Sequence, residues 1–556
     1  MLASLLAVGG CTPTDNGATF RYFEYQGQDA RFDKTINAER EYLNPIISGF
    51  YPDPSICRKG DDYYMVHSTF SYFPGIPILH SRDLVNWEQI GNVLDRPSQL
   101  QLDGIRLDGG VYAPAISYNK ANDTFYLVNT CVDGIGNFVV KTQDPRQGWS
   151  EPILLPDVGG IDPSFFFDED GKAYIINNDA PENIPEYDGH RAIWIHDYDV
   201  ATDQTFGTPQ AIVDGGTDKS KKPVWIEGPH IYKIKGKYYL MAAEGGTSTN
   251  HSEVIFTAEN VKGPYTPVIE NPVLTQRDLP EERAEKVTCT GHADLIETPT
   301  GEWFAIFLGC RPYEDDLYNT GRETFLLPVS WENDVPIILE KGKALPTVVA
   351  PNNWKADTEN IRPEAFTGNF TWKDDFKGDK LGMRWLFIRT PHSNWWKLNN
   401  DGLHITPTTD NINKIGTPAF VGYRQQHTNF TVTTQMNFTP KTEQDIAGLV
   451  CYQNERFNIV FGKTLRAGKE SIVVISTVNN VQTEPQHYTL NETEKDYPIY
   501  LRIVGKAGTY DFELSFDGNN WQPVATGVDA TILSTHKAGG FTGTVIGMYA
   551  GANAKS

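Results

Sequence analysis

The 556-residue sequence predicts an all-β protein in which a five-bladed β-propeller is followed by a β-sandwich. Three observations support this prediction. Aromatic residues make up 12% of the chain beside abundant glycine and proline, helical periodicity is scarce, and one hairpin-like segment recurs five times. A chain of this length exceeds what one hydrophobic core holds, so we expect two or three domains.

Each recurring segment starts at a small or acidic residue and passes through a strand, a polar turn and a second strand. The five segments start at Asp53, Ala113, Asp162, Gly228 and Ala293. They end at the pairs Tyr63-Tyr64, Phe125-Tyr126, Ala173-Tyr174, Tyr238-Tyr239 and Trp303-Phe304. Proline follows the first residue in all but the fifth. Repeated antiparallel hairpins are typical of propeller blades, which close radially and protect their strand edges.

A propeller places the first strand of every blade at the same end of a central channel. The residues at these five starts are Asp53, Tyr112-Ala113, Asp162, Glu227 and His292. We therefore expect three carboxylates, one aromatic ring and one imidazole to meet in a pocket. Glu227 and His292 stand one residue before the register of Asp53 and Asp162, so their side chains must turn inward.

Asp53 has the stiffest backbone of this set, because it lies between Pro52 and Pro54. Each proline ring restricts its own φ and the residue before it. A carboxylate held in this way is aimed in a fixed direction. The alternative interpretation is an ordinary surface turn, for which Pro-Asp-Pro is also suitable.

The sequence divides into four predicted segments. Residues 1–20 form a signal and a flexible linker, residues 21–350 the propeller, residues 351–370 a polar linker, and residues 371–556 the sandwich. The sandwich prediction comes from alternating strands without the repeat, separated by turn residues. These strands are expected at residues 402–405, 430–433, 472–475 and 510–516.

The apolar start of the chain ends at Cys11 and is too short to span a bilayer. It is similar to a secretion signal that ends in a bacterial lipobox, with Val8-Gly9-Gly10 before a lipid-accepting Cys11, although no Lys or Arg precedes it. This predicts a lipoprotein of the bacterial cell envelope, in the periplasm or at the outer membrane. A disordered or buried N-terminus is the alternative.

Charge and cysteine usage narrow the possible partners. The net charge of −23 argues against nucleic acid, an anionic membrane surface or a polyanionic substrate, whereas a neutral substrate is unaffected. The six cysteines show no metal-type spacing, and most are expected to be small buried side chains. Disulfide pairing and oligomeric state stay open.

Several motifs occur in the order seen in glycoside hydrolase family 43, and the chain resembles that family over nearly its whole length. They are residues 49–56, 68–70, 80–87, 160–165, 225–230, 291–294 and 321–324. Residues 372–376 and 540–543 are similar to the concanavalin-like sandwich of the family's β-xylosidase and α-L-arabinofuranosidase branch. The resemblance implies a five-bladed propeller, in agreement with the repeats.

The resemblance implies an exo-acting, inverting glycosidase that releases terminal xylose or arabinofuranose from plant cell-wall oligosaccharides. Such an enzyme needs one carboxylate as general base for water and one carboxylic acid to protonate the leaving oxygen. By the family pattern Asp53 is the base and Glu227 the acid. Asp162 would be the third carboxylate, which orients Glu227 and raises its pKa through like charge.

The resemblance also implies sugar-binding residues. Arg322 would bind sugar hydroxyls through its fork of donors, Phe70 would pack an apolar sugar face, and Phe541 would reach the lip of the pocket from the sandwich. His292 would help to hold a calcium ion or its waters. Tyr112 stands where related xylosidases often carry Trp, so β-xylosidase and α-L-arabinofuranosidase remain rival assignments.

Each assignment has a structural alternative. Glu227 could be a salt-bridged strand end, Asp162 a turn residue, Arg322 a surface partner of Glu323, Phe541 part of the sandwich core, and His292 a satisfied core histidine. No cofactor is required by the chemistry, and calcium is the one metal that the resemblance suggests. A carbohydrate-binding propeller with a lectin-like sandwich is the alternative function, and an intact acidic trio argues against it.

Overall fold

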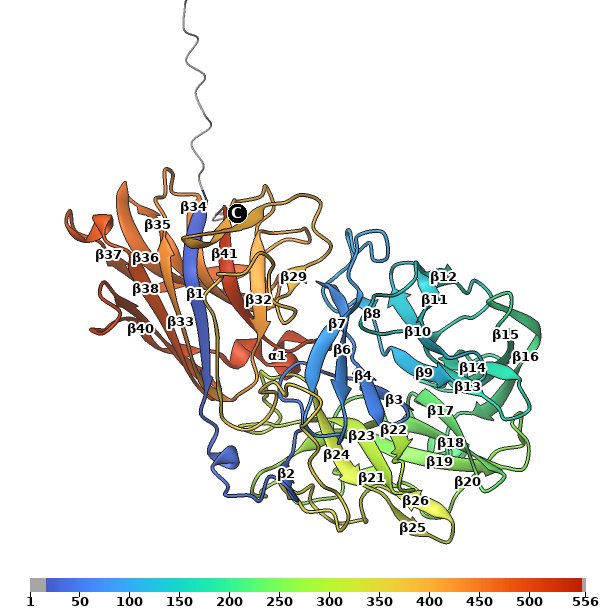
Figure 1. Ribbon diagram of the computed structural model, residues 1–556. Helices are drawn as coiled ribbons and strands as arrows, with labels where there is room; N and C mark the ends of the chain where they lie inside the picture. The colour runs from blue at the N-terminus through green and yellow to red at the C-terminus, as the bar shows by residue number, and fades with distance from the viewer. Residues whose placement is uncertain (1–16, 553–556) are drawn as a thin grey trace, which may run out of the picture.

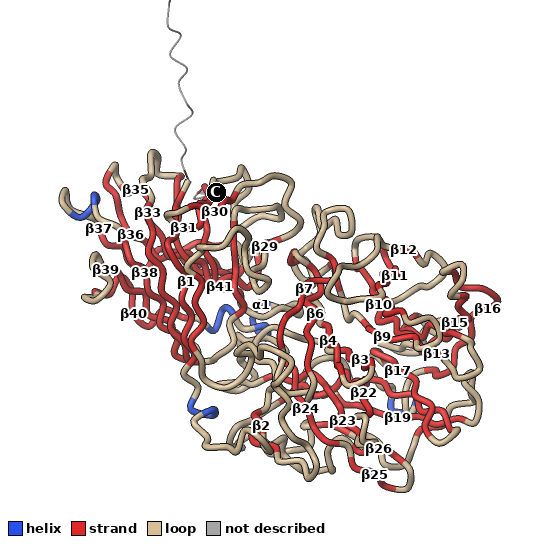
Figure 2. Tube along the Cα trace, in the orientation of Figure 1, coloured by secondary structure: helices blue, strands red, loops and turns tan. Residues whose placement is uncertain are grey.

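The computed structural model describes residues 17–552, and the predicted signal with Cys11 lies outside this range (Figure 1). Nearly all the regular secondary structure of the described chain is β-strand, and loops connect the strands (Figure 2). Its helices are η1 (Ala30–Phe32), η2 (Lys219–Lys221), η3 (Glu494–Asp496), η4 (Thr531–Leu533) and α1 (Thr535–Ala538). None of these helices is long and apolar enough to cross a bilayer. The predicted all-β class is confirmed.

Five antiparallel sheets form the propeller. Blade 1 contains β3 (Ser55–Lys59), β4 (Asp62–Val66), β6 (Gly75–Ser81) and β7 (Glu88–Leu94). Blade 2 contains β8 (Gly110–Val111), β9 (Ala115–Asn119), β10 (Thr124–Val132), β11 (Gly136–Thr142) and β12 (Ile153–Leu154). Blade 3 contains β13 (Ile161–Phe167), β14 (Ala173–Asp179), β15 (Ala192–Asp199) and β16 (Gln204–Asp214).

Blade 4 contains β17 (Glu227–Ile234), β18 (Lys237–Glu244), β19 (Ser252–Ala258), β20 (Thr266–Pro267) and β21 (Leu274–Thr275). Blade 5 contains β22 (Thr288–Glu297), β23 (Trp303–Cys310) and β24 (Glu323–Pro328). Two small sheets flank the ring: β2 (Tyr42–Leu43) pairs with β27 (Val348–Val349), and β25 (Ser330–Glu332) with β26 (Val335–Ile337). All five predicted hairpins are present.

The ring closes through one strand of each blade. Strand β3 contacts β9, β9 contacts β13, β13 contacts β17, β17 contacts β22, and β22 returns to β3. These are the strands that begin at the predicted convergence points. Their contacts around a closed circuit place the starts of the five repeats at one central channel, as a propeller requires.

Three of these strands are irregular where they start. The ladder skips two residues between Ile161 and Ser164 in β13, between Glu227 and His230 in β17, and between Gly291 and Asp294 in β22. The first skipped residue has a left-handed backbone in each case, with φ of 55° at Asp162, 57° at Gly228 and 53° at His292. Bulges of this kind re-aim side chains.

These bulges correct one predicted register. His292 occupies the same bulge position as Asp162, so the expected one-residue offset of His292 is wrong. Glu227 does precede that position by one residue, because Gly228 occupies it. The sequence alignment started the fifth repeat at Ala293 and so put Asp294 opposite the prolines. In the structure Asp294 corresponds to Ser164, and Ala293 takes the place of the proline.

The second body is a sandwich of two antiparallel sheets. The larger runs in the order β30 (Trp396–Asn399), β31 (Gly402–Ile405), β1 (Ala18–Gly27), β33 (Asn429–Asn437), β38 (Ile499–Lys506), β39 (Thr509–Ser515) and β40 (Gln522–Asp529), and β28 (Thr371–Asp374) also pairs with β1. The smaller runs in the order β32 (Phe420–Arg424), β41 (Val545–Ala552), β34 (Asp445–Asn454), β35 (Phe457–Arg466), β36 (Lys469–Val478) and β37 (Val481–Thr489).

Strand β1 belongs to the sandwich and not to the propeller. In Figure 1 it is the blue strand among orange and red ones. It pairs with β28, β31 and β33 and buries Phe20, Phe23 and Tyr25. The predicted start of the propeller at residue 21, and a flexible linker reaching residue 20, are therefore wrong for this stretch. Its alternating side chains need a sheet that only residues beyond 370 provide.

The segment 351–370, predicted as a linker, is packed against the propeller. Trp354 and Phe366 are buried, and the Trp354 indole donates a hydrogen bond to the Asp83 carbonyl at 2.6 Å. The Ser48 amide donates to the Phe366 carbonyl at 2.8 Å. The segment is therefore an ordered connection packed on the propeller, and not a flexible linker.

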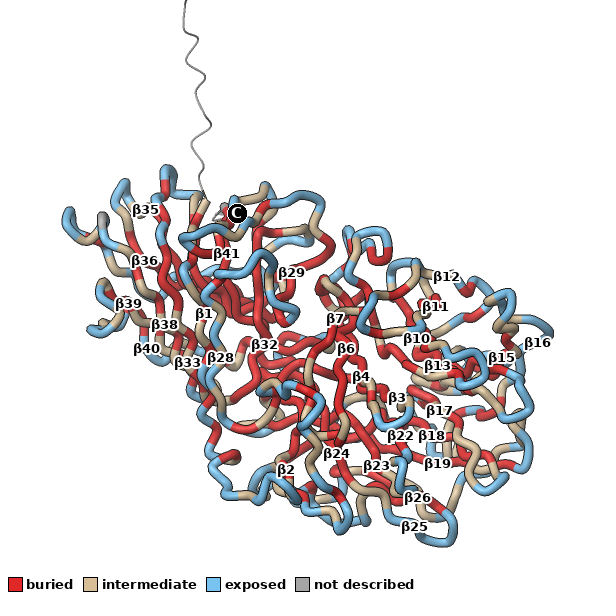
Figure 3. Tube along the Cα trace, in the orientation of Figure 1, coloured by how far each residue is buried: buried red, intermediate tan, exposed pale blue. Residues whose placement is uncertain are grey.

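Buried residues run through both bodies and through the junction between them (Figure 3). Strand β5 (Tyr72–Phe73) of the propeller side pairs with β29 (Phe387–Ile388) of the sandwich side, so one small sheet spans the junction. The five described cysteines are buried and unpaired.

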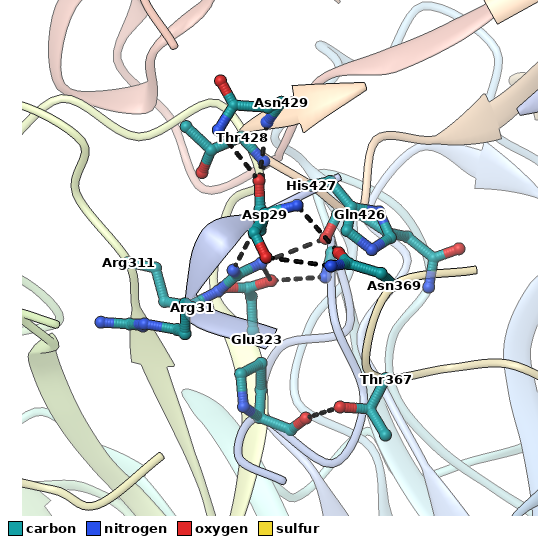
Figure 4. A network of polar contacts seen from close by, with 12 residues as sticks. Asp29, Arg31, Arg311, Glu323, Thr367, Asn369, Gln426, His427, Thr428 and Asn429 are labelled. Atoms are coloured by element: carbon teal, nitrogen blue, oxygen red, sulfur yellow. Dashed lines mark hydrogen bonds and ion pairs between the residues drawn. The ribbon is translucent and has the colours of Figure 1, made fainter. Parts of the chain in front are cut away.

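A buried polar network around Arg311 also ties the two bodies together (Figure 4). Arg311 donates to Glu323 through Nε at 2.5 Å and Nη2 at 2.8 Å, and to Asp29 through Nη1 at 3.0 Å. Asp29 accepts in turn from the backbone amides of Thr428 and Asn429 at 3.0 and 2.7 Å. Every charge here has a partner, as buried charges require.

Candidate active site

A cavity of about 560 Å³ opens where the first strands of the blades begin. All eight residues that the sequence assigned to the site line it: Asp53, Phe70, Tyr112, Asp162, Glu227, His292, Arg322 and Phe541. Most of the wall comes from the propeller, whereas Gly540 and Phe541 come from the sandwich. The predicted convergence of three carboxylates is thus found in the structure.

The surroundings of Asp53 favour its ionised carboxylate form. The Ser68 hydroxyl donates to Oδ2 at 2.6 Å, and Arg322 donates through Nη1 to Oδ1 at 2.8 Å and through Nη2 to Oδ2 at 3.3 Å. Burial alone would raise the pKa of Asp53, but the charge of Arg322 and the hydrogen bond from Ser68 lower it. A charged, oriented carboxylate of this kind can accept a proton from water.

Glu227 has the opposite electrostatic setting. Burial, followed by the negative charges of Asp162 and Asp53, raises the pKa of Glu227 well above its usual value. Burial and the charge of Asp53 also raise the pKa of Asp162 to about 7. Among the described residues, none forms a hydrogen bond or ion pair with the Glu227 side chain. The raised pKa favours the protonated form of Glu227, which is the form that can donate a proton.

The left-handed bulge explains how Asp162 reaches Glu227. Asp162 Oδ2 accepts a hydrogen bond from the Gly228 amide at 3.2 Å, one residue beyond Glu227. Gly228 has φ of 57°, and a Cβ there would meet the His292 ring at 2.9 Å. Asp162 therefore holds the backbone that carries the acid, and only glycine fits between that backbone and His292.

The aromatic residues form one stack beside Arg322. Phe541 stacks on Phe70 with ring centroids 6.0 Å apart, and Phe70 stacks on Phe50 at 5.9 Å. The guanidinium of Arg322 lies 5.6 Å from the Phe541 ring centroid. Phe541 is half-buried and offers a ring surface to the cavity, so the sandwich supplies part of the wall, as predicted.

Phe70 does not suit the role that the sequence assigned to it. It is 1% exposed, so it offers almost no ring surface to a sugar. Its neighbours Phe50, Phe541 and Tyr112 cover it. Phe70 supports the stack from beneath, and Phe541 replaces it as the aromatic surface of the pocket.

Tyr112 lies in the same cluster, 5.8 Å from Phe541 between ring centroids. Its hydroxyl donates to the Asp108 carbonyl at 2.8 Å. The hydroxyl that distinguishes Tyr112 from the tryptophan of related xylosidases is therefore already engaged in a hydrogen bond. Tyr112 contributes to the shape of the pocket more than to its polarity.

His292 lies beside Asp53, with Nδ1 3.8 Å from Asp53 Oδ1. Burial lowers the pKa of His292 to about 4, so the ring is neutral at ordinary pH. Calcium takes six to eight oxygen ligands. Both Asp53 oxygens already accept from Arg322 and Ser68, and no three His, Cys, Asp or Glu side chains of residues 17–552 are grouped to hold a metal ion. These residues do not by themselves fit calcium.

The structure adds residues that the sequence analysis missed. Thr247 accepts a hydrogen bond from Arg322 Nη1 at 3.1 Å, and Ser68 orients Asp53. Trp225, Arg106 and Asp108 also line the cavity. Ser68 precedes Phe70 in a motif already noted, so it could have been found. Trp225 likewise opens the motif at residues 225–230, but no role was assigned to it. Thr247, Arg106 and Asp108 lie outside the noted motifs and carry no local signal.

Comparisons with known proteins agree with this geometry. Residues 42–336 match the family described as glycosyl hydrolases family 43, and residues 373–556 match its β-xylosidase C-terminal concanavalin A-like domain. The protein is a glycoside hydrolase. More narrowly, the chain belongs to glycoside hydrolase family 43, and the predicted family, propeller-and-sandwich fold and enzyme class are confirmed.

Three relatives illustrate the match. A non-reducing end α-L-arabinofuranosidase of Bacteroides ovatus is 35% identical, with 93% of each chain covered. The crystal structure of a GH43_12 protein from a capybara gut metagenome is 44% identical with a TM-score of 0.89, covering 96% of this chain and 99% of that one. A xylan β-1,4-xylosidase from Bacillus halodurans is 32% identical with a TM-score of 0.80, covering 92% and 96%.

Proposed function

We propose that this chain is an exo-acting, inverting glycosidase that releases terminal xylose or arabinofuranose from hemicellulose oligosaccharides. The observation that carries the proposal is the contrast between Asp53 and Glu227, two carboxyl groups in one cavity with pKa values shifted in opposite directions. Such a pair is how a glycosidase separates its base from its acid at one pH. A lectin has no use for that separation.

In this mechanism Asp53 accepts a proton from a water molecule that attacks the anomeric carbon. Glu227 donates its proton to the oxygen that leaves with the rest of the oligosaccharide. Arg322 holds Asp53 in place, and the neutral His292 ring beside it leaves the negative charge of Asp53 available for the proton. Asp162 keeps the pKa of Glu227 high.

Exo action is supported by the way the cavity is walled. Phe541 and Gly540 of the sandwich line the cavity together with the propeller residues that bear the carboxylates. The packed junction between the two bodies keeps this wall in place. Digestion of xylohexaose and of an arabinofuranosyl xylo-oligosaccharide should release monosaccharide first. Mid-sized fragments appearing before monosaccharide would contradict exo action.

The stereochemistry is tested directly by proton NMR during hydrolysis of 4-nitrophenyl β-xyloside and 4-nitrophenyl α-L-arabinofuranoside. Inversion predicts that the first sugar to appear has the anomeric configuration opposite to that of the substrate. Release of the same anomer would show that Asp53 is not the base of an inverting enzyme. The ratio of kcat/KM on the two substrates decides between the xylosidase and arabinofuranosidase assignments.

We also propose that Cys11 carries a lipid that anchors the enzyme to the bacterial cell envelope. The support is the short apolar segment ending in Val8-Gly9-Gly10 before Cys11. Expression in a bacterium fed radiolabelled palmitate should label the chain, and Cys11→Ser should abolish the label. Equal labelling of the two forms would refute the anchor.

A further inference from the structure

Trp225 is a large apolar side chain left open at the cavity wall. It is 36% exposed, lines the cavity and precedes Glu227 by two residues. Its backbone is left-handed, with φ of 48°. A bulky residue rarely adopts this conformation, and such strain persists only where the surrounding structure holds it, often at functional sites. Nothing in the reaction described above uses this side chain.

The surroundings of Trp225 fix its position. The Trp225 amide donates to the Gly189 carbonyl at 2.9 Å. The guanidinium of Arg191 stacks over the indole, with Cζ 4.8 Å from the ring centroid. Arg191 is itself held by two hydrogen bonds to Asn178 Oδ1, at 2.9 and 2.7 Å. One side of the indole is thus occupied by a fixed cation, and the exposed remainder adjoins the cavity.

Glycine at position 189 permits this arrangement. Gly189 has φ of 79°, and a Cβ there would lie 2.9 Å from Val224 and 3.5 Å from Trp225. The loop that carries Gly189 therefore closes directly against the residues before the acid. Val224 is also exposed, at 41%, so the apolar surface extends outward from the indole.

We propose that Trp225 is the platform for the leaving-group sugar, the ring joined to the terminal pentose through the bond that is cut. The inference rests on the proposed function. Glu227 must protonate the oxygen between these two sugars, so the second sugar lies on the Glu227 side of the cavity, where Trp225 stands. An indole packs well against the apolar C–H face of a sugar ring, and Arg191 prevents the indole from turning away.

This platform makes Trp225 a specificity residue for leaving groups that contain a ring. It predicts that Trp225→Ala lowers kcat/KM on xylobiose by about three- to tenfold, the range expected when one aromatic stacking partner is lost. Xylosyl fluoride has no ring in its leaving group, so its kcat/KM should stay within about twofold of wild type. Trp225→Phe should restore most of the xylobiose activity.

The matched control is Trp331→Ala. Trp331 is also 36% exposed, but it lies on β25, packs against Trp303 at 5.9 Å between ring centroids and does not line the cavity. Trp331→Ala should leave kcat/KM at the wild-type value for both xylobiose and xylosyl fluoride. Equal losses on xylobiose and xylosyl fluoride in Trp225→Ala would overturn the platform, because they would show a general effect on Glu227 or on folding. Unchanged kinetics on both would overturn it too.

Binding separates this inference from the proposed function. Titration calorimetry with xylotriose, carried out in the Asp53→Asn background so that the sugar is not cleaved, should give a larger dissociation constant with Trp225→Ala than with Trp225 intact. If the wild-type chain binds xylotriose but cleaves no pentoside, the proposed reaction is refuted. The role of Trp225 is then judged from the difference in affinity alone. Equal affinities of the two chains would refute the platform whatever the reaction.

Discussion

Arg311 and Arg322 are both buried arginines that bind carboxylates, but they differ in how fully their donors are used. Arg311 at the junction donates through Nε, Nη1 and Nη2 to Asp29, Glu323 and the Gln426 carbonyl. In the cavity, Arg322 leaves Nε without a partner among the described residues. Glu227 nearby likewise has no polar partner within residues 17–552.

This difference separates a structural cluster from a catalytic one. Buried polar groups are normally satisfied, and a saturated network fixes two surfaces in one arrangement. The cavity holds charges and a neutral acid that are incompletely satisfied by the protein, so a ligand with several hydroxyl groups has partners to bind. Arg322 and Glu323 are adjacent in sequence. Arg322 belongs to the cavity cluster and Glu323 to the Arg311 cluster, so the two clusters meet at neighbouring residues.

The largest effect is expected from removing the base of the catalytic cluster. Asp53→Asn keeps the shape of the side chain but cannot accept the proton from water. We expect kcat/KM on 4-nitrophenyl β-xyloside to fall about 100- to 10,000-fold, the usual loss of general base catalysis. Circular dichroism should show an intact fold. Activity within a few-fold of wild type would mean that another group activates the water.

Breaking the structural cluster should cost stability instead of chemistry. Arg311→Met leaves Asp29 and Glu323 as buried carboxylates without their cation, so the free energy of unfolding should fall by about 3–5 kcal/mol. Urea unfolding measures the change, and kcat/KM of the folded protein should stay near wild type. Arg466→Met, at an exposed pair with Glu484, is the control and should cost less than about 1 kcal/mol. Wild-type stability in Arg311→Met would show that the Arg311 cluster does not have a structural role.

Phe541 tests whether the sandwich takes part in binding. Phe541→Ala removes the half-buried ring that covers Phe70 and adjoins Arg322, so we expect KM to rise by about tenfold with a smaller change in kcat. The thermal unfolding midpoint reports whether the ring instead serves the core, since a core cavity would lower stability by about 3–5 kcal/mol. Normal kinetics in a well-folded variant would exclude a binding role.

Asp162→Asn sharpens the electrostatic side of the comparison. After burial, the charge of Asp162 is the next cause of the raised pKa of Glu227. Its removal lowers that pKa, so Glu227 loses its proton at a lower pH. The basic limb of the kcat/KM profile should therefore move to lower pH. A basic limb that stays in place, or moves to higher pH, would show that Asp162 does not control the acid.

Removal of divalent cations should have the smallest effect. Because the residues around His292 do not provide the oxygen ligands that calcium needs, dialysis against EDTA should leave kcat/KM and the thermal midpoint unchanged. Added calcium should not raise the midpoint, as a ligand of the native state would. A rise would show that water molecules complete a site that the side chains alone do not form.

The propeller could be predicted from the sequence because each of its hairpins is formed by residues close together in the chain. Each hairpin, such as β3–β4 around Tyr63, lies within about a dozen residues, where periodicity is readable. Strand β1 was assigned to the wrong body because its partners follow the whole propeller. Nothing within the segment 18–27 indicates which of two sheets completes it.

The site shows the same division. Asp53 and Asp162 were predicted because they recur at one place in the repeat, and Glu227 because it stands one residue before that place. Trp225 was missed because its importance depends on a left-handed backbone and on Arg191, which lies 34 residues earlier in the chain. The covering of Phe70 by Phe541 also depends on a contact between distant segments, which no local pattern records.

The placement of β1 and Phe541 has a consequence for synthesis. Domains generally fold as units during translation, with the earlier parts of a chain first. The partners of β1, which are β28, β31 and β33, leave the ribosome only after the propeller. Strand β1 therefore has no sheet to join while the blades form. The cavity likewise acquires Phe541 after all three carboxylates are in place. On the proposed mechanism, the nascent propeller therefore holds its acid and base before the sandwich completes the wall of the pocket.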